Sequence, residues 1–388
     1  MSFDPMRRFV RHRGACLLAA VLLAACGGDD PPPATLRGAY LPVRLANSPS
    51  SADLMGVNGL DVDSRGNVYV ADRSSQLLVF SPEGAVLRKL GRKGQGPGEF
   101  DWPQVVRVLP GDSVYAFDTG LQRVTVFPPR SDRAAYSVNV GTNAMLFSYW
   151  AFPATSTRGI FAAYRASFGD GDGRGLHGHR KEVLRLLNPD GSILRDSVAA
   201  FAEAEALFLH GPVEGVMFNP FGRQPVFAFG GGDRVYAAWN GELAIDVYSA
   251  TGQRIRTIRP AVTPRPRPIT EKDRDSVVAD LARTAPAAVV RRAFAEAGSD
   301  SWPLFRDMVV DDADRVWLGL LGAHGEPVHW TAFDQAGAQV ASMDLPENVS
   351  LRVVRGRMAY GVELDEDDVP RVVIYELRPL RPAPARGT

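Results

Sequence analysis

Short runs in which apolar and polar residues alternate recur along this chain, and turns rich in Gly and Asp separate them. Each repeat begins with an Asp/Gly turn, continues through a Val-Tyr or Val-Trp pair and an apolar strand, and ends in a Gly-containing turn. The clear copies span residues 63–91, 110–138, 231–258 and 311–343, and weaker copies span 156–198 and 355–377. Strands of this length and spacing predict an all-β protein built from repeated antiparallel sheets.

The first copy is the most regular of these repeats. It reads LDVD, then GNVYVAD, then LLVFSPEGAVLRKLG, and GQGPGEF and Pro103 follow it. Over residues 56–103 this sequence resembles an NHL-type repeat; the resemblance is loose in the next unit, and only the strand pattern persists beyond that. The repeats and this resemblance together imply a six-bladed β-propeller with about 40 residues in each blade.

The Gly-rich segment LGRKGQGPGEF, residues 90–100, follows a strand-like run directly. A phosphate-binding loop needs a helix N-terminus after its glycines, because the free N–H groups there face the anion. The next residues, DWPQVVRVLPGDSVYAFD, instead have a proline, apolar residues at strand spacing and a turn, and no Lys-Ser or Lys-Thr pair. The pattern therefore predicts a connector from the outer strand of one blade to the inner strand of the next.

The last repeat supplies only three strands, near residues 349–355, 357–364 and 370–378. The segment TLRGAYLPVRLA, residues 35–46, forms a further strand-like run that precedes the first blade. We expect it to be the fourth strand of the last blade, because pairing the two ends closes the ring and removes a free sheet edge.

One segment, at about residues 265–300, breaks the β pattern. Thr270 and Asp273 are spaced as a capping box, and apolar residues at helical spacing follow them. A second helix begins near Pro286 and ends at Gly298. We expect this two-helix insertion between blades four and five. Either it covers or rims the face where the central channel opens, or it is a solvated decoration packed on the rim.

The N-terminal residues are typical of a secretory signal, with four arginines followed by an apolar stretch that ends in small residues. The segment Leu23-Ala24-Ala25-Cys26 resembles a bacterial lipobox, which implies cleavage before Cys26 and lipid on its sulfur; the alternative is an ordinary signal peptide with a chance cysteine. By the same resemblance, Gly27 favours the outer membrane, facing the periplasm or the cell surface. The expected division is a signal peptide at 1–25, a Pro-rich tether at 26–35, the propeller at 36–380 and a flexible tail at 381–388.

Charge and cysteine content narrow the possible partners. Removal of residues 1–25 takes four arginines and one aspartate from 44 basic and 44 acidic residues, which leaves a net charge of about −3. This balance gives no reason to expect nucleic acid as a partner, and we expect a monomer that contacts the membrane only through its lipid. Because Cys16 lies in the discarded segment, the mature domain has no disulfide and must be stabilised by burial.

Candidate ligand-binding side chains fall in the loops that join second and third strands, and beside the Gly-rich connector. Such loops converge on one face of a propeller, where recognition commonly resides. The candidates are Arg73, Trp102, Asp118, Arg123, His177, His179, Trp239, Glu242, His324 and His329. Trp102 could stack on a ligand or be a packed rim aromatic.

The same residues give no recognised metal site. The histidines lack a ligand spacing typical of zinc, and DGDG at 170–173 lacks the distal glutamate of a calcium loop. The acidic run at 363–368 could bind calcium, although a solvated acidic loop is the simpler interpretation. We therefore predict no metal and no cofactor.

Two classes of function remain. The first is a non-catalytic envelope lipoprotein whose propeller face binds a protein, a peptide or a glycan. The second is a metal-dependent enzyme at the central channel, since propellers of this shape include lactonase-like hydrolases and a peptide-amidating lyase. Degenerate repeats and the lack of a clear ligand set favour binding.

Overall fold

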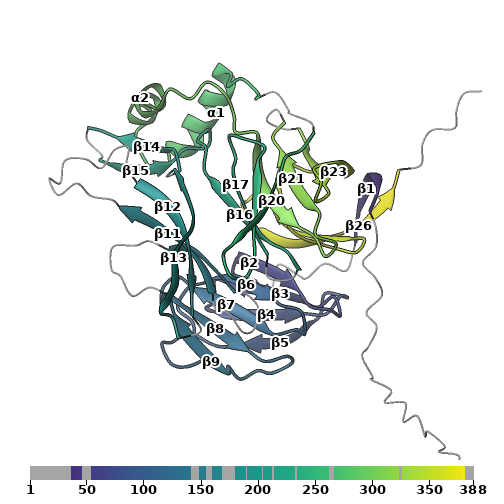
Figure 1. The fold of residues 1–388 in the computed structure, drawn as a ribbon. Coiled ribbons are helices and arrows are strands. Elements are labelled where there is room, and N and C mark those ends of the chain that lie inside the picture. Colours follow the sequence, from purple (N-terminus) through teal and green to yellow (C-terminus); the bar gives the residue numbers. More distant parts are fainter. Residues whose placement is uncertain are drawn as a thin grey trace, which may run out of the picture. The chain divides into compact units, whose positions relative to one another are not determined.

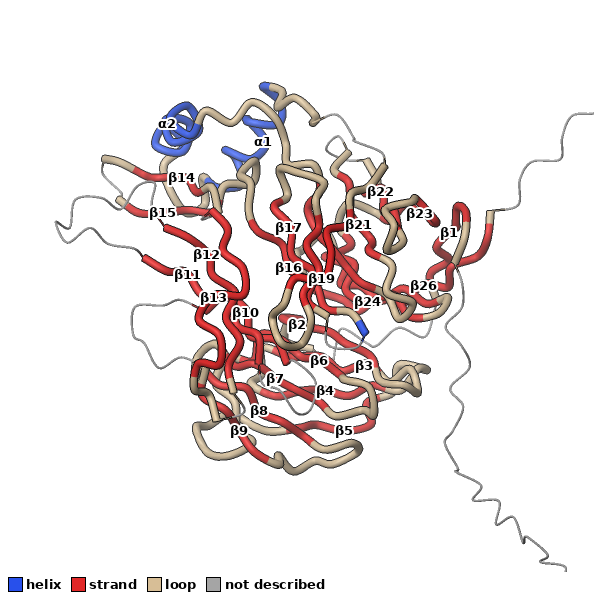
Figure 2. The backbone as a smooth tube through the Cα atoms, viewed as in Figure 1, coloured by secondary structure: helices blue, strands red, loops and turns tan. Residues whose placement is uncertain are grey.

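The computed structural model describes residues 36–45, 54–140, 148–153, 160–167, 180–188, 190–202, 204–211, 214–231, 234–261, 266–322 and 326–380. The expected signal peptide with Cys26, the tether and the tail lie outside these residues. The described chain is mostly β-strand, with two helices (Figures 1 and 2). Neither of them is long and apolar enough to cross a membrane.

Within the described residues, four sheets hold four antiparallel strands each, in the order in which the strands follow along the chain. The first two sheets consist of β2 (Val57–Val62), β3 (Val68–Asp72), β4 (Gln76–Phe80) and β5 (Val86–Leu90), and of β6 (Pro103–Val108), β7 (Val114–Asp118), β8 (Arg123–Phe127) and β9 (Tyr136–Asn139). The next two consist of β10 (Ser148–Pro153), β11 (Ile160–Ser167), β12 (Arg180–Leu187) and β13 (Ile193–Ala202), and of β16 (Pro225–Phe229), β17 (Val235–Trp239), β18 (Ile245–Tyr248) and β19 (Arg254–Ile258).

The second strand of a sheet is its most buried part. Every side chain of β3 and of β7 is buried, whereas three of the five in the fourth strand β5 are exposed. Neighbouring sheets cover both faces of a second strand, so its residues are apolar on both sides. This explains the recurring Val-Tyr and Val-Trp pairs, in which Tyr69, Tyr236 and Trp317 are almost completely buried.

An eight-stranded sheet unites the two ends of the described chain. Its members are β20 (Phe305–Val310), β21 (Val316–Leu320), β22 (Val328–Phe333), β23 (Gln339–Leu345), β24 (Val349–Arg355), β25 (Met358–Leu364), β26 (Pro370–Pro379) and β1 (Gly38–Arg44). β1 pairs antiparallel with β26, and Leu41 lies opposite Arg378. This confirms the strand pairing expected from the sequence. β1 also pairs parallel with β23, and Ala39 lies opposite Ser342. The sequence analysis did not predict this second ladder.

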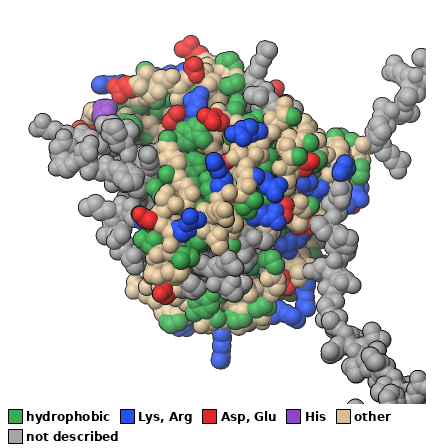
Figure 3. Space-filling view, viewed as in Figure 1, with side chains coloured by type: hydrophobic (Ala, Val, Ile, Leu, Met, Phe, Trp, Pro, Cys, Tyr) green, Lys and Arg blue, Asp and Glu red, His purple; other side chains and the backbone are tan. Residues whose placement is uncertain are grey.

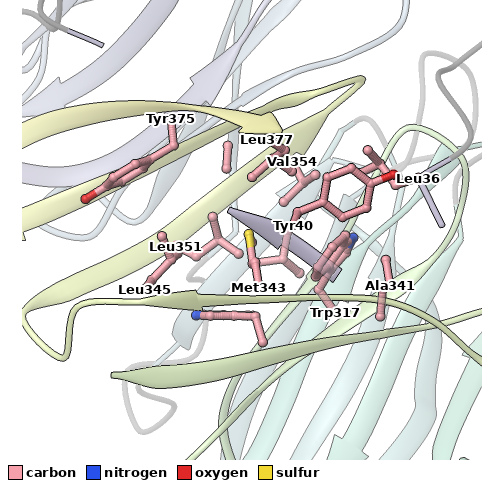
Figure 4. Packing of buried hydrophobic residues seen from close by; sticks show 14 of the residues in the cluster. Leu36, Tyr40, Trp317, Ala341, Met343, Leu345, Leu351, Val354, Tyr375 and Leu377 are labelled. Carbon is pink, nitrogen blue, oxygen red and sulfur yellow. The ribbon is translucent and has the colours of Figure 1, made fainter. Parts of the chain in front are cut away.

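The core around β1 shows how this double pairing is stabilised (Figure 4). Tyr40 and Leu36 are buried together with Trp317 from β21 and Met343 from β23. Leu377 from β26 belongs to the same cluster. One short N-terminal strand therefore shares its apolar core with both halves of the eight-stranded sheet.

First strands of successive sheets pack against one another. β2 lies against β6 and β24, β6 against β10, and β20 against β16 and β24. A side chain at Gly59 would meet the β6 backbone, because its Cβ would lie 2.8 Å from the carbonyl oxygen of Gln104. Five of these first strands, β2, β6, β16, β20 and β24, line one cavity of about 450 Å³. Sheets that radiate from first strands around a shared cavity define a propeller-like architecture.

The two-helix insertion occurs between β19 and β20, as expected. α1 (Glu271–Leu281) begins at Thr270 with the predicted capping box, and α2 (Ala287–Ala297) ends at Gly298 in the left-handed conformation. The helices pack on a separate hairpin, β14 (Ala206–Leu209) and β15 (Gly215–Phe218), which follows β13. We call the apolar core that the helices and the hairpin share the satellite core. Within it, the ring centres of Phe221 and Phe294 lie 5.2 Å apart. The sequence analysis did not predict this hairpin as the partner of the helices.

Candidate functional site

Strand direction divides the propeller-like body into two faces. Because the strands alternate in direction, the turns that join first to second strands and third to fourth strands share one face, here called the turn face. The loops between second and third strands, the links between sheets and the two helices share the opposite face, here called the insertion face. Different segments of the chain therefore rim the two ends of the cavity.

Carboxylates join neighbouring sheets on the turn face. Asp112 accepts hydrogen bonds from the main-chain N and the hydroxyl of Ser64, at 2.9 and 2.8 Å. Asp314 accepts a hydrogen bond from the main-chain N of Gly231 at 2.9 Å, and Asp312 accepts a hydrogen bond from the main-chain N of Gly356 at 2.9 Å. Each bond links the short turn of one sheet to that of the next, so these turns have a structural role.

A β-bulge recurs near the start of the first strands, at the insertion-face end of the cavity. The pairing register shifts after the first paired residue of β2, β6, β10 and β20, and after Leu351, the third paired residue of β24, whereas β16 pairs without a shift. Bulges turn a side chain away from its regular direction and are frequent beside active sites. In four of these strands the bulged residue is polar and lines the cavity: Asn58, Gln104, Arg306 and Arg352.

The bulged residues form an arc of two cations and two amides. β20, β24, β2 and β6 contact one another in that order, so Arg306 and Arg352 lie on neighbouring strands and Asn58 and Gln104 on the two strands that follow. Asn58 donates from Nδ2 to the carbonyl oxygen of Pro103 at 2.9 Å. Gln104 accepts from Nε1 of Trp102 through its Oε1 at 3.1 Å. We call these four residues the bulge arc.

A second polar layer lies farther along the same strands, toward the turn face. Oδ2 of Asp61 accepts a hydrogen bond from the N of Val108 at 2.9 Å and lies 3.4 Å from Nε of Arg107. The guanidinium of Arg107 lies 6.0 Å from the ring centre of Phe229. Asp61 is only 3% exposed, so its charge is balanced within the structure and not by solvent.

Two of the residues predicted as ligand-binding, Asp118 and Arg123, form hydrogen bonds with the Gly-rich connector and the residues that follow it. Asp118 is fully buried and accepts hydrogen bonds from the N of Asp101 at 2.7 Å and of Trp102 at 3.1 Å. Arg123 donates from Nη1 to the carbonyl oxygen of Gln95 at 2.8 Å, and from Nη2 to those of Gly96 and Glu99 at 2.6 and 2.5 Å. Both carboxylate oxygens of Asp118 and both Nη atoms of Arg123 therefore have partners within the protein.

The connector itself runs from β5 to β6, as the sequence analysis predicted. Gly91 has φ 74°, and a Cβ there would lie 2.6 Å from the ring of Phe100, which is completely buried. The glycine therefore lets the backbone pass over an anchored aromatic ring. Arg123 from β8 binds three carbonyl oxygens of this loop, so the loop conformation is explained without a phosphate.

The other predicted residues within the described part of the chain are dispersed over the surface. Trp102 is 47% exposed beside the bulge arc, and Arg73 is an exposed residue of the β3–β4 turn that lies against Gly56. Trp239 ends β17 and Glu242 is exposed in the following turn. His329 pairs with Asp344 through Nδ1 and Oδ1 at 2.6 Å, and both side chains are largely exposed. His177, His179 and His324 lie outside the described residues.

No group of three or more His, Cys, Asp or Glu side chains within the described residues could hold a metal ion. Figure 3 shows several Lys and Arg side chains near the middle of the face drawn there, with hydrophobic side chains between them. The cavity lining combines arginines, aspartates and the amides of Asn58 and Gln104 with apolar side chains.

Sequence reasoning missed the bulge arc. Aligning the first strands as NGLDV, QVVRV, RDMVV and RVVRG would have placed Asn58, Gln104, Arg306 and Arg352 at one equivalent position. The repeat comparison relied on the Val-Tyr and Val-Trp pairs of the second strands, which define the core. A bulge depends on pairing between strands, so the side-chain direction was not available from the alternation alone.

No family model matches this chain, and no curated protein matches it. Among solved structures it is similar to a putative exported protein from Bacteroides fragilis, at 11% identity and a TM-score of 0.49 over 89% of this chain and 96% of that one. It is also similar to virginiamycin B lyase from Staphylococcus aureus, at 10% identity and a TM-score of 0.38 over 88% of this chain and 89% of that one. A third is the aldose sugar dehydrogenase of Streptomyces coelicolor in its PQQ-bound form, at 15% identity and a TM-score of 0.38 over 87% and 96%. The propeller-like assignment rests on the sheet topology described above.

Proposed function

We propose that this chain is an exported, lipid-anchored, six-bladed β-propeller that binds a protein, peptide or glycan ligand of the cell envelope without catalysing its conversion. The count of six treats the eight-stranded sheet as two blades that β1 joins, next to the four sheets of four strands. The lipobox-like sequence before Cys26 supports attachment to the membrane, and Gly27 supports the outer membrane.

The observation that carries this proposal is the bulge arc. Four equivalent positions on neighbouring strands turn polar side chains toward one end of a cavity of about 450 Å³. A volume of this size suits a small molecule or the end of a chain, and mixed polar and apolar walls are typical of ligand sites. The turn face has short turns linked to one another, so the insertion face is the more suitable surface for recognition.

A comparison of two surface variants of the full chain, purified in detergent, tests the proposal. Trp102→Ala changes the surface beside the bulge arc, whereas Arg65→Ala changes an exposed residue in a turn-face loop. Envelope oligosaccharides and peptides are screened for a rise in unfolding temperature, because a ligand that binds only the folded state stabilises it.

An oligosaccharide or peptide that raises the unfolding temperature of the parent and of Arg65→Ala, but not that of Trp102→Ala, supports binding at the insertion face. Stabilisation that is lost in Arg65→Ala and kept in Trp102→Ala contradicts it. Chemical conversion of the ligand, together with a metal bound in stoichiometric amount by elemental analysis, would show that the chain is a metal-dependent hydrolase or lyase instead.

A further inference from the structure

We propose that the bulge arc binds an anionic group, a carboxylate or a phosphate, through the guanidinium groups of Arg306 and Arg352. This inference rests on the proposed binding function and names the chemical class of its ligand. The ligand would place its anionic group between these two arginines and its uncharged polar groups toward Asn58 and Gln104.

The two arginines have hydrogen-bond donors to spare. Nε of Arg306 is 2.7 Å from Oδ2 of Asp307, but its Nη2 is buried and has no hydrogen-bond partner within the described residues. Arg352 is exposed at the cavity and forms no hydrogen bond or ion pair with the part of the chain that the structure describes. A buried donor without a partner is costly, and an anionic oxygen bound there would remove that cost.

The residues beside these arginines hold the backbone in place. Phe305 next to Arg306 is completely buried, and Leu351 next to Arg352 is 3% exposed. β20 and β24 contact each other, and each is hydrogen-bonded to its own second strand. Two planar guanidinium groups that project from fixed neighbouring strands match the paired oxygens of a carboxylate or a phosphate.

The charge balance of the cavity also favours an anion, because its carboxylates already have partners. Asp61 lies beside Arg107, Asp307 beside Arg306, and Asp311 beside Arg315 at 2.7 Å. Asp312 accepts its hydrogen bond from a main-chain N. Arg352 in the bulge arc therefore carries a positive charge that no lining aspartate neutralises, and a site with low-dielectric walls concentrates that field.

The cavity walls limit what else the ligand can be. Phe227 and Phe229 of β16 and Met308 of β20 supply apolar surface, whereas Asn58 of β2 and Gln104 of β6 supply amides. Together with the volume of about 450 Å³, this suits an acidic or phosphorylated sugar or a peptide C-terminus, and it is too small for a folded partner to enter.

Calorimetric titration of the full chain in detergent tests the inference with three probes: glucuronate, glucose 6-phosphate and glucose. We expect at least one of the two anions to bind and glucose to bind at least ten-fold more weakly. Binding of glucuronate alone identifies a carboxylate site, binding of glucose 6-phosphate alone a phosphate site, and binding of both a general anion site.

Arg352→Met should weaken the anion about ten-fold or more, because it removes a charge-assisted donor, and Arg352→Lys should restore part of the loss. Arg65→Met on the turn face is the control for a change in net charge, and unfolding temperature reports whether each variant is folded. Anion binding that is equal in the parent and in the Arg306→Met, Arg352→Met double variant overturns the inference, as does the failure of both anions to bind. If an envelope ligand is lost in Trp102→Ala but unaffected by Arg352→Met, the proposed binding function stands and only this inference fails.

Discussion

Arg315 donates from Nη1 to the main-chain carbonyl oxygen of Leu36 at 2.9 Å, across 279 positions of sequence. The same guanidinium pairs with Asp311, whose Oδ2 lies 2.7 Å from its Nε and also accepts from Nε1 of Trp317 at 2.8 Å. Leu36 lies two residues before Gly38, where the ladder between β1 and β23 begins. A buried ion pair in the β20–β21 turn therefore fixes the entry of the N-terminal strand.

Arg315→Met should destabilise the whole eight-stranded sheet. The carboxylate of Asp311 would remain almost completely buried without its partner, and removal of one member of a buried pair costs about 3–5 kcal/mol. Arg44→Met removes the pair between Arg44 and Glu363, in which the arginine side chain is 46% exposed, and should cost less than about 1 kcal/mol. Denaturant unfolding of both variants gives the comparison. Equal stabilities would show that Arg315 does not anchor β1.

Arg123→Met should release the Gly-rich connector without unfolding the sheets. Loss of charged donors from three main-chain carbonyl oxygens should destabilise the loop by about 2 kcal/mol or more. Hydrogen exchange at residues 94–100 measures this directly, and we expect it to become faster there while β7 remains protected. Arg92→Met is the matched control, because the Arg92 side chain is 81% exposed where it pairs with Glu99. Similar exchange in both variants would contradict the role of Arg123.

The elements that the sequence predicted correctly depend on neighbouring residues. The second strands follow from Val-Tyr and Val-Trp pairs, and α1 follows from the local spacing of Thr270 and Asp273. The β1–β26 pairing was accessible by a different route, because a closed ring requires a fourth strand for the last unit. Local pattern and closure together therefore identify the strands, the helices and one long-range ladder.

The features that escaped prediction depend on residues that are distant in sequence. The parallel ladder between Ala39 and Ser342 adds to an antiparallel pairing that already satisfies closure, so no sequence pattern demands it. The β14–β15 hairpin can be recognised only from the apolar core that it shares with α2, in which Phe221 packs against Phe294. Asp118 and Arg123 have the residue types of binding groups, and only their hydrogen bonds show that they hold the connector.

Acid should loosen the satellite core through Asp273. Burial alone would raise the pKa of this carboxyl group, but hydrogen bonds from Thr270 and the guanidinium of Arg267 outweigh it and lower the pKa from 3.8 to about 2. A depressed pKa contributes stability that is present above the unfolded value and lost as the pH falls from about 4 to about 2. The contribution is on the order of 2 kcal/mol.

Hydrogen exchange in α1 between pH 6 and pH 2 measures this contribution. The parent should lose protection over the lower part of that range, after correction for the intrinsic exchange rate. Asp273→Asn should be less protected at pH 6 and should change less with pH, because the asparagine does not titrate. Parallel pH profiles in the two chains would show that other carboxylates account for the acid sensitivity of α1.

Cys26→Ala should abolish both the processing and the lipidation of the chain. By resemblance to bacterial lipoproteins, the peptidase that cuts before Cys26 acts after lipid has been attached to that sulfur, so the variant should keep residues 1–25 and carry no lipid. Intact mass and incorporation of labelled palmitate in the native host measure the two effects. The chain has one other cysteine, Cys16, within the expected signal peptide. Cys16→Ala should therefore be cut and lipidated like the parent, and the lipoprotein interpretation is wrong if Cys26→Ala has the same mass and label as this control.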